Sequence, residues 1–120
     1  MTPEEKIDKL DGLIRRIVNK DNKMEGQYSM PYSDSSDDYA DWKVEFKVDK
    51  VSLWETEKYD RCKYSGSVYI DADVMIGFEG DWEEYVIGDL PSWVKDDIED
   101  KIFNNIEQFL PMVCVDLTFN

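Results

Sequence analysis

The sequence contains no histidine, and cysteine occurs only twice, at Cys62 and Cys114. Without histidine, a serine or cysteine nucleophile lacks its usual base, and a zinc site lacks its usual nitrogen ligand. The two cysteines lie far apart in the chain, so we expect two reduced, partly buried thiols and no disulfide framework. The sequence therefore predicts a protein that is not an enzyme and that has neither a metal site nor another cofactor.

Long hydrophobic runs are also missing. No run approaches the roughly 18 apolar residues that a membrane-spanning helix needs, and the N-terminus lacks the apolar block of a secretory signal. We therefore expect a soluble, cytoplasmic protein without a membrane partner, located in the host cytoplasm or the virion if its source is viral.

Positive charge is scarce. The chain has 14 Lys/Arg against 28 Asp/Glu, a net charge of −14. Residues 1–23 carry six Lys/Arg against five Asp/Glu, so the remaining residues, with eight against twenty-three, hold −15. Such a surface repels nucleic acid directly and attracts a basic protein partner. The alternative is that the negative charge serves only to keep the protein soluble.

A core can nevertheless form. The 120 residues are 42% hydrophobic and include four Trp, seven Tyr and five Phe. That length suits a single domain, here residues 1–120, and the apolar content argues against global disorder. The first element is a helix over residues 3–20, where Thr2 caps the start and Ile7, Leu10, Ile14 and Val18 recur at helical spacing.

Residues 21–41 show no sustained period, and we expect an acidic loop. Its segment Ser33–Trp42 contains Asp34, Asp37, Asp38 and Asp41. These carboxylates partly match a calcium-binding loop, but Tyr39 stands where glycine is needed and a strand follows. A weak divalent site remains an alternative to a solvated loop that meets a cationic protein.

Antiparallel strands are expected over residues 42–87. Apolar residues alternate from Trp42 to Val48 and then shift by one to Val51 and Leu53, which indicates either a β-bulge or a tight turn. The clearest strand covers residues 68–76, and Gly80-Asp81 fits the centre of a two-residue hairpin turn that returns residues 82–87.

A second helix is expected over residues 91–110, with Pro111 ending it, and a final strand over residues 112–119. The order is α-β-β-β-(β)-α-β. It predicts an α+β two-layer sandwich, in which both helices cover one face of a four- or five-stranded antiparallel sheet and the last strand lies at an edge or beside the first strand.

Three features outside the loop are candidates for partner contact. Asp71 and Asp73 share one face of a strand, about 6.7 Å apart along the backbone, which is typical of either a carboxylate pair or the solvent side of a sheet. Trp54 and Trp82 are expected to be exposed. Asp96 and Asp100 lie one helical turn apart and repel each other, which indicates a functional role for negative charge at this position.

These observations predict a non-enzymatic acidic module that binds a basic surface of a partner protein, as an inhibitor, an immunity protein or a nucleic-acid mimic does. The predicted partner-binding residues are Asp34, Asp37, Asp38, Asp41, Trp54, Asp71, Asp73, Trp82, Asp96 and Asp100. One alternative is a small structural subunit of a virus particle or another assembly, whose apolar final strand adds to a neighbouring sheet. A weak divalent-cation-binding protein is the third.

Overall fold

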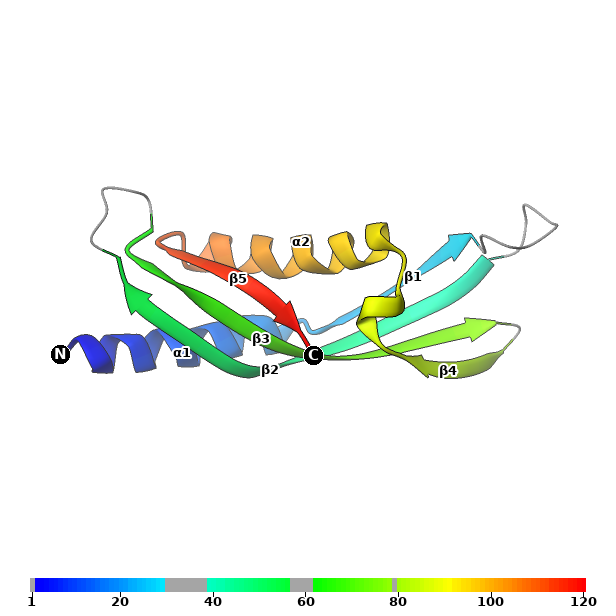
Figure 1. The fold of residues 1–120 in the computed structure, drawn as a ribbon, viewed down its shortest axis with the longest axis horizontal. Coiled ribbons are helices and arrows are strands. Elements are labelled where there is room, and N and C mark those ends of the chain that lie inside the picture. The colour runs from blue at the N-terminus through cyan, green and yellow to red at the C-terminus, as the bar shows by residue number, and fades with distance from the viewer. Residues whose placement is uncertain (1, 30–38, 57–61, 79) are drawn as a thin grey trace.

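The computed structural model describes residues 2–29, 39–56, 62–78 and 80–120. The elements follow the expected order, with one additional strand near the N-terminus (Figure 1). They are α1 (Pro3–Lys20), β1 (Lys23–Ser29), β2 (Tyr39–Glu55), β3 (Tyr64–Phe78), β4 (Asp81–Tyr85), the 3₁₀ turn η1 (Ile87–Asp89), α2 (Ser92–Phe109) and β5 (Val113–Phe119). The predicted α+β class is confirmed. Neither described helix is long and apolar enough to cross a membrane.

The two sides of the sheet are built differently, with one strand, β1, at one edge and two strands, β4 and β5, at the other. β1, β2 and β3 are consecutive antiparallel neighbours, whereas β4 and β5 share the remaining edge of β3. β4 pairs antiparallel with Val74–Phe78, and β5 pairs with Tyr64–Ile70. The β3–β5 pair is parallel, because β5 returns through α2 and so enters the sheet in the direction of β3. The sheet is therefore antiparallel through its first four strands only.

A β-bulge at Asp49 lets β2 run the length of the molecule. Val48 pairs with Ile70 and Lys50 with Tyr69, so Asp49 has no residue opposite it in β3. The extra residue inverts the alternation, and the apolar side chains before and after it face the helices alike. The shift seen in the sequence is therefore a bulge and not a turn. Buried residues of this helix-facing side are Trp42, Val44, Phe46, Val48, Val68, Ile70, Val74 and Ile76, against Ile14, Val18, Val94, Ile98, Ile102 and Ile106.

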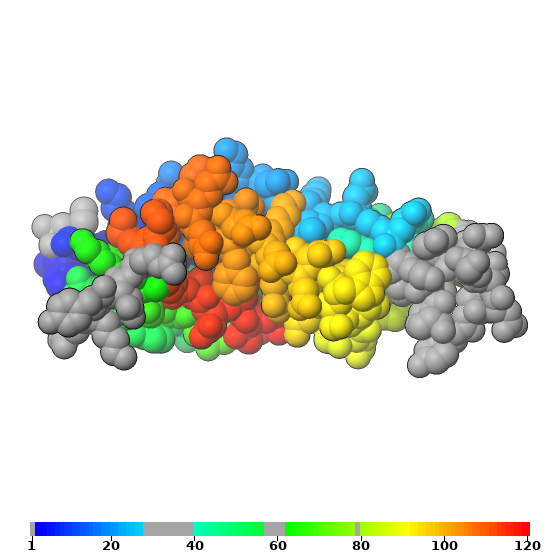
Figure 2. Space-filling model, turned by 90° about the horizontal axis from the view of Figure 1, so that it is seen from above, coloured from blue at the N-terminus to red at the C-terminus, as the bar shows by residue number. Residues whose placement is uncertain are grey.

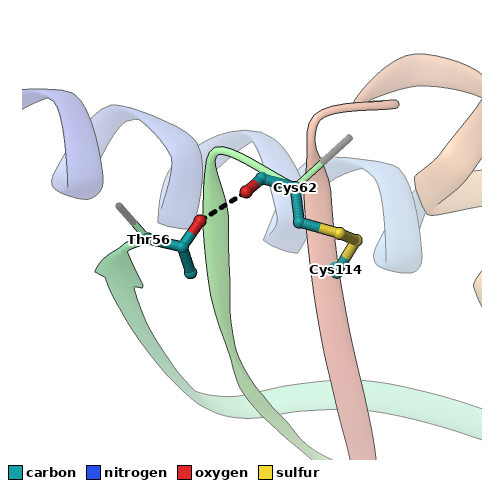
Figure 3. The surroundings of a disulfide bond; sticks show 3 residues. All are labelled: Thr56, Cys62 and Cys114. Atoms are coloured by element: carbon teal, nitrogen blue, oxygen red, sulfur yellow. Dashed lines mark hydrogen bonds between the residues drawn. A yellow bond between two sulfur atoms is a disulfide. The ribbon is translucent and has the colours of Figure 1, made fainter. Parts of the chain in front are cut away.

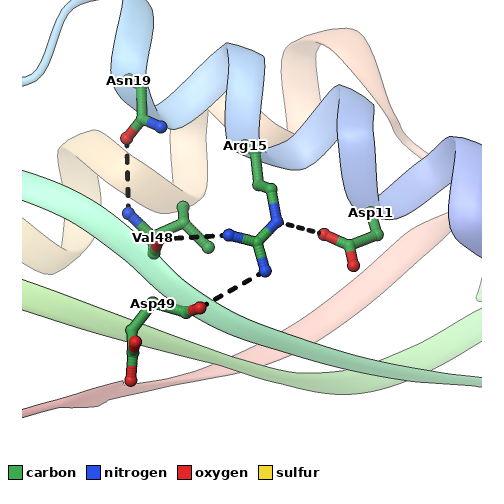
Figure 4. A network of polar contacts seen from close by, with 5 residues as sticks. All are labelled: Asp11, Arg15, Asn19, Val48 and Asp49. Atoms are coloured by element: carbon green, nitrogen blue, oxygen red, sulfur yellow. Dashed lines mark hydrogen bonds and ion pairs between the residues drawn. The ribbon is translucent and has the colours of Figure 1, made fainter.

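Helix α1 covers the edge of β2 where β1 has ended (Figure 4). Arg15 donates to the carbonyls of Val48 (3.2 Å) and Asp49 (3.3 Å), while Asn19 accepts from the Val48 amide (3.3 Å). Asn22 donates to the Phe46 carbonyl (3.0 Å) and accepts from its amide (2.9 Å). Consecutive carbonyls normally point to opposite sides of a strand, but here one guanidinium meets both. These bonds satisfy the backbone groups that the missing strand leaves open.

The expectation of an irregular loop over residues 21–41 is wrong at both ends. Lys23–Ser29 forms β1, and β2 begins at Tyr39. A Cβ on Gly26 would lie 2.6 Å from the Trp42 ring, so this glycine gives the tryptophan its space in the sheet. Asp34, Asp37 and Asp38 lie outside the described residues.

The hairpin between β3 and β4 is present, but one residue earlier than expected. The sequence predicted Gly80 and Asp81 as the two central residues of the turn. Phe78 instead pairs with Asp81, so Asp81 already belongs to β4 and Gly80 is the second of the two central residues. Its φ of 89° is a backbone conformation that glycine adopts without strain. β4 then ends at Tyr85, because Ile87 turns into the core as part of η1.

The expectation of two reduced thiols is also wrong. Cys62 and Cys114 form a disulfide with a Cα–Cα distance of 5.6 Å, which is in the usual range (Figure 3). The parallel β3–β5 pair, in which Tyr64 lies opposite Val113 and Ser65 opposite Cys114, brings the two cysteines together from positions 52 apart in the sequence. Thr56 donates to the Cys62 carbonyl and also holds β2 to this end of the sheet.

We predict that Arg15→Lys lowers the free energy of unfolding by about 1–2 kcal/mol, because a single ammonium cannot meet both bulge carbonyls and Asp11 together. Arg16→Lys is the matched control, since Arg16 is exposed, and it should change stability by less than about 0.5 kcal/mol. Urea unfolding measures both. Equal midpoints for the two variants would show that α1 does not hold the bulge.

Replacing both cysteines by serine should cost roughly 4 kcal/mol, the chain-entropy value for a closed loop of 52 residues. The wild type in reductant should unfold at the same denaturant concentration as the double variant, and reductant should leave the variant unchanged. A wild-type midpoint that does not respond to reductant contradicts a stabilising bridge.

Candidate interaction surface

Five of the seven predicted contact residues that the structure describes project from the open face of the sheet, which we define as the face turned away from the helices. Asp41, Asp71 and Asp73 alternate with the buried positions of β2 and β3 and are exposed. Trp82 pairs with Gly77, which in turn pairs with Asp41. Trp54 projects from the same face at the far end of β2. The structure therefore places these five residues on one side of the sheet.

The open face is not uniformly acidic. β2 presents lysines between its carboxylates, and Lys47 lies opposite Asp71 while Lys43 lies opposite Glu25. Cross-strand partners of opposite charge stabilise a sheet modestly. The acids of this face are therefore largely balanced, and only Asp73, opposite Glu45, meets another carboxylate.

Two adjoining hollows of about 580 and 540 Å³ lie over the middle of the open face and share Glu45 and Asp73. Asn120 donates to Asp71 (3.0 Å) and to Asp49 (3.4 Å) in the first of them. An amide thus joins these two carboxylates. Among the described residues, no group of three or more His, Cys, Asp or Glu is arranged to hold a metal ion.

The two predicted tryptophans have different surroundings. Trp82 is 40% exposed, and its ring lies over Gly77, where a Cβ would be 2.8 Å from the indole. The Lys43 ammonium lies 4.1 Å from the centre of the Trp82 ring. Trp54 is 52% exposed, next to Ser65. Trp82 is therefore fixed by packing on one side and open on the other.

A concentration of negative charge also occurs over residues 80–100, and we call this segment the acidic end. This segment has eight Asp/Glu and one Lys, and it comprises β4, η1 and the first half of α2 (Figure 1). Figure 2 shows atoms of η1 and the start of α2, in yellow, at the surface beside the rest of the helix. Its exposed carboxylates are Asp81, Glu83, Glu84, Asp89, Asp96, Asp97 and Asp100.

These carboxylates are not compensated locally. Within the described part of the chain, the two ion pairs are Arg15–Asp11 (2.7 Å) and Lys101–Asp21 (3.5 Å), and neither includes a residue of the acidic end. Of the eight large apolar side chains that are exposed among the described residues, five lie there or next to it: Phe78, Trp82, Tyr85, Val86 and Trp93. The acidic end therefore combines uncompensated charge with exposed aromatic surface.

The structure divides the predicted site. Trp82, Asp96 and Asp100 all belong to the acidic end. Asp96 and Asp100, however, lie on α2, which covers the face of the sheet opposite to the one that carries Asp71 and Asp73. The molecule extends 59 Å along its longest axis. Trp54 lies next to the C-terminal end of β2, and Figure 1 shows that end of β2 on the opposite side of the molecule from β4. The sequence analysis did not single out Asp81, Glu83, Glu84, Asp89 or Tyr85. Counting Asp and Glu in successive segments of the sequence would have identified these carboxylates.

No protein-family model, curated protein or solved structure matches this chain.

Trp82→Ala should lower the free energy of unfolding by about 1–2 kcal/mol, because it uncovers Gly77 and removes the contact with the Lys43 ammonium. Trp54→Ala is the matched control, and its stability should stay within about 0.5 kcal/mol of the wild type, since half of this side chain is in solvent. Chemical denaturation compares the two, and an equal loss in both variants would mean that Trp82 has no packing role of its own.

Proposed function

We propose that this chain is a non-enzymatic protein-binding module whose acidic end engages a basic surface of a partner protein, in the manner of an inhibitor, an immunity protein or a nucleic-acid mimic. The observation that supports this most is the coincidence, over residues 80–100, of eight carboxylates against one lysine with exposed Trp82, Tyr85 and Val86. Charge alone would suit solubility. Aromatic side chains in the same place give a surface that can be desolvated.

The two components have separate physical roles. Carboxylates without local cations produce a field that extends about 8–10 Å into physiological solution and accelerates the approach of a basic protein. Aromatic and aliphatic side chains then supply contact area whose burial stabilises the complex. Nucleic acid and anionic membranes would be repelled by the same field, so neither is a direct partner in this proposal.

A non-enzymatic role is supported by the chemistry of the exposed groups. Asp71 on the open face is opposed by Lys47 and joined to Asp49 by Asn120, and the chain has no histidine to serve as a base. A weak divalent site remains a hypothesis from the sequence, and three of its four carboxylates, Asp34, Asp37 and Asp38, lie outside the described residues.

The second candidate is a structural subunit of a virus particle or another assembly. It is favoured by β5, an apolar strand that pairs with β3 alone among the described strands and therefore leaves one edge open to a neighbour. Sedimentation at high protein concentration tests it, and a monomer throughout counts against self-assembly.

The disulfide bears on the compartment. The expectation of a cytoplasmic location rested on the lack of an apolar run or a secretory signal, whereas the Cys62–Cys114 bridge favours an oxidising compartment. We propose that the bridged form is the active one. Counting free thiols in protein taken from its natural source, with alkylation at lysis, tests this, and two free thiols would favour the cytoplasm.

The test of the binding proposal begins with recovery of a partner from cell extract on the immobilised protein at low salt. A variant with Glu83→Gln, Glu84→Gln, Asp96→Asn and Asp100→Asn should then bind at least about tenfold more weakly at 50 mM salt, since each exposed contact contributes about 0.2–1 kcal/mol. The wild-type affinity should fall steeply as salt is raised, and that of the variant less so.

The matched control neutralises four exposed carboxylates elsewhere, with Glu4→Gln, Asp8→Asn, Glu25→Gln and Glu55→Gln. It makes the same change in net charge and should keep affinity within about threefold of the wild type, which corresponds to about 0.65 kcal/mol. Equal weakening by both variants would place the effect in net charge and not in the acidic end. An affinity independent of salt would overturn the proposal.

A further inference from the structure

The outer edge of β5 carries unpaired backbone groups. The Met112 carbonyl accepts from the Tyr64 amide (3.2 Å) and the Asn120 amide donates to the Ile70 carbonyl (2.9 Å), so even-numbered residues of β5 direct their polar groups to β3. Since this direction alternates along a strand, Val115, Leu117 and Phe119 direct theirs away from β3. Within the described residues, no other element bonds to the backbone of these three.

The other edges of the sheet are covered or charged. α1 satisfies the edge of β2, β4 presents Asp81, Glu83 and Glu84, and β1 presents Lys23 and Glu25. β5 is regular, contains neither proline nor glycine, and has Asp116 as its one charged side chain. It therefore lacks most of the features by which proteins prevent strand addition.

A groove runs beside this edge. It has a volume of about 430 Å³ and is formed by Phe103, Ile106 and Glu107 of α2 together with Val113 and Val115 of β5, next to the disulfide. Figure 2 shows atoms of β5, in red, at the surface beside α2, in orange. A strand added to β5 would direct every second side chain to this side of the sheet, and the side chain nearest Val115 into the groove, so apolar residues suit those positions.

Carboxylates lie near the position of such an added strand on both faces of the sheet. Glu107 lines the groove, and Glu99 lies two helical turns before it, on the same side of α2. Asp116 is exposed on the opposite, open face of the sheet. A strand in this position would therefore gain from Lys or Arg at the positions between its apolar residues.

We propose that the edge of β5 binds an extended segment of a partner protein in which apolar residues alternate with Lys or Arg, and that the segment adds to the sheet as a further strand. Its backbone pairs with Val115, Leu117 and Phe119, its apolar side chains enter the groove beside Phe103, and its basic side chains lie near Asp116. The proposal rests on the proposed function for the basic character of the partner, but it concerns a different surface from the acidic end.

The test uses a nine-residue peptide of alternating Lys and Val as the probe. In the disulfide-bonded protein, the amides of Val115, Leu117 and Phe119 should exchange with solvent rapidly, and at saturating peptide at least tenfold more slowly, as measured by NMR. N-methylation of one alternate set of peptide amides should abolish this protection, and methylation of the other set should preserve it. Equal effects of the two sets would overturn strand addition.

The charge requirement is tested with Glu107→Lys and Asp116→Lys in one protein, which should bind the peptide at least tenfold more weakly. The control reverses Glu4 and Asp8, which makes the same change in net charge at exposed residues that do not line the groove, and should bind within threefold of the wild type. Equal weakening by both would remove the role of the groove carboxylates.

The two proposals fail separately. The variant neutralised at Glu83, Glu84, Asp96 and Asp100 should still show protection of the three β5 amides by the peptide. If the peptide binds but perturbs only the acidic end, strand addition is wrong and the proposed function stands. If the peptide protects the three amides but a basic partner does not bind the acidic end, the proposed function is wrong and strand addition stands.

Discussion

The contact between Arg15 and the bulge of β2 is the interaction on which the architecture depends. β2 must present apolar side chains to the helices on both halves of a sheet that follows a 59 Å molecule. The extra residue at Asp49 makes this possible, but it turns two carbonyls toward one side. A guanidinium has the planar, multiple-donor geometry to meet both. The same bonds place α1 against β2 and close that edge.

The parts of the fold that follow from local pattern could be predicted from the sequence. α1, α2 and β3 have long, regular hydrophobic periods, and the structure confirms them. β1 could not be predicted in this way, because Lys23–Ser29 has glycine at its centre and no clear alternation. The reason for Gly26 lies in its neighbour Trp42, 16 positions along the chain. The disulfide and the parallel pairing of β5 likewise depend on contacts between distant residues.

The candidate surface could be predicted only in part. The proposal of a basic partner comes from the net charge, and the number of carboxylates over residues 80–100 can be counted in the sequence. The balance of charge on the open face is not, since Lys43 and Lys47 are set against Glu25 and Asp71 only by the strand register. Burial separates the tryptophans in the same way: Trp42 fills the core, and Trp54 and Trp82 remain exposed.

The position of the disulfide determines what a protease could do to this protein. Cys62 and Cys114 enclose the whole of β3, β4, η1 and α2. A single backbone cut in this stretch, for example at the Gly80 hairpin or in the η1 turn, leaves the two fragments covalently joined. The acidic end would therefore stay attached to the scaffold after cleavage, and separation of the pieces would require reduction as well as proteolysis.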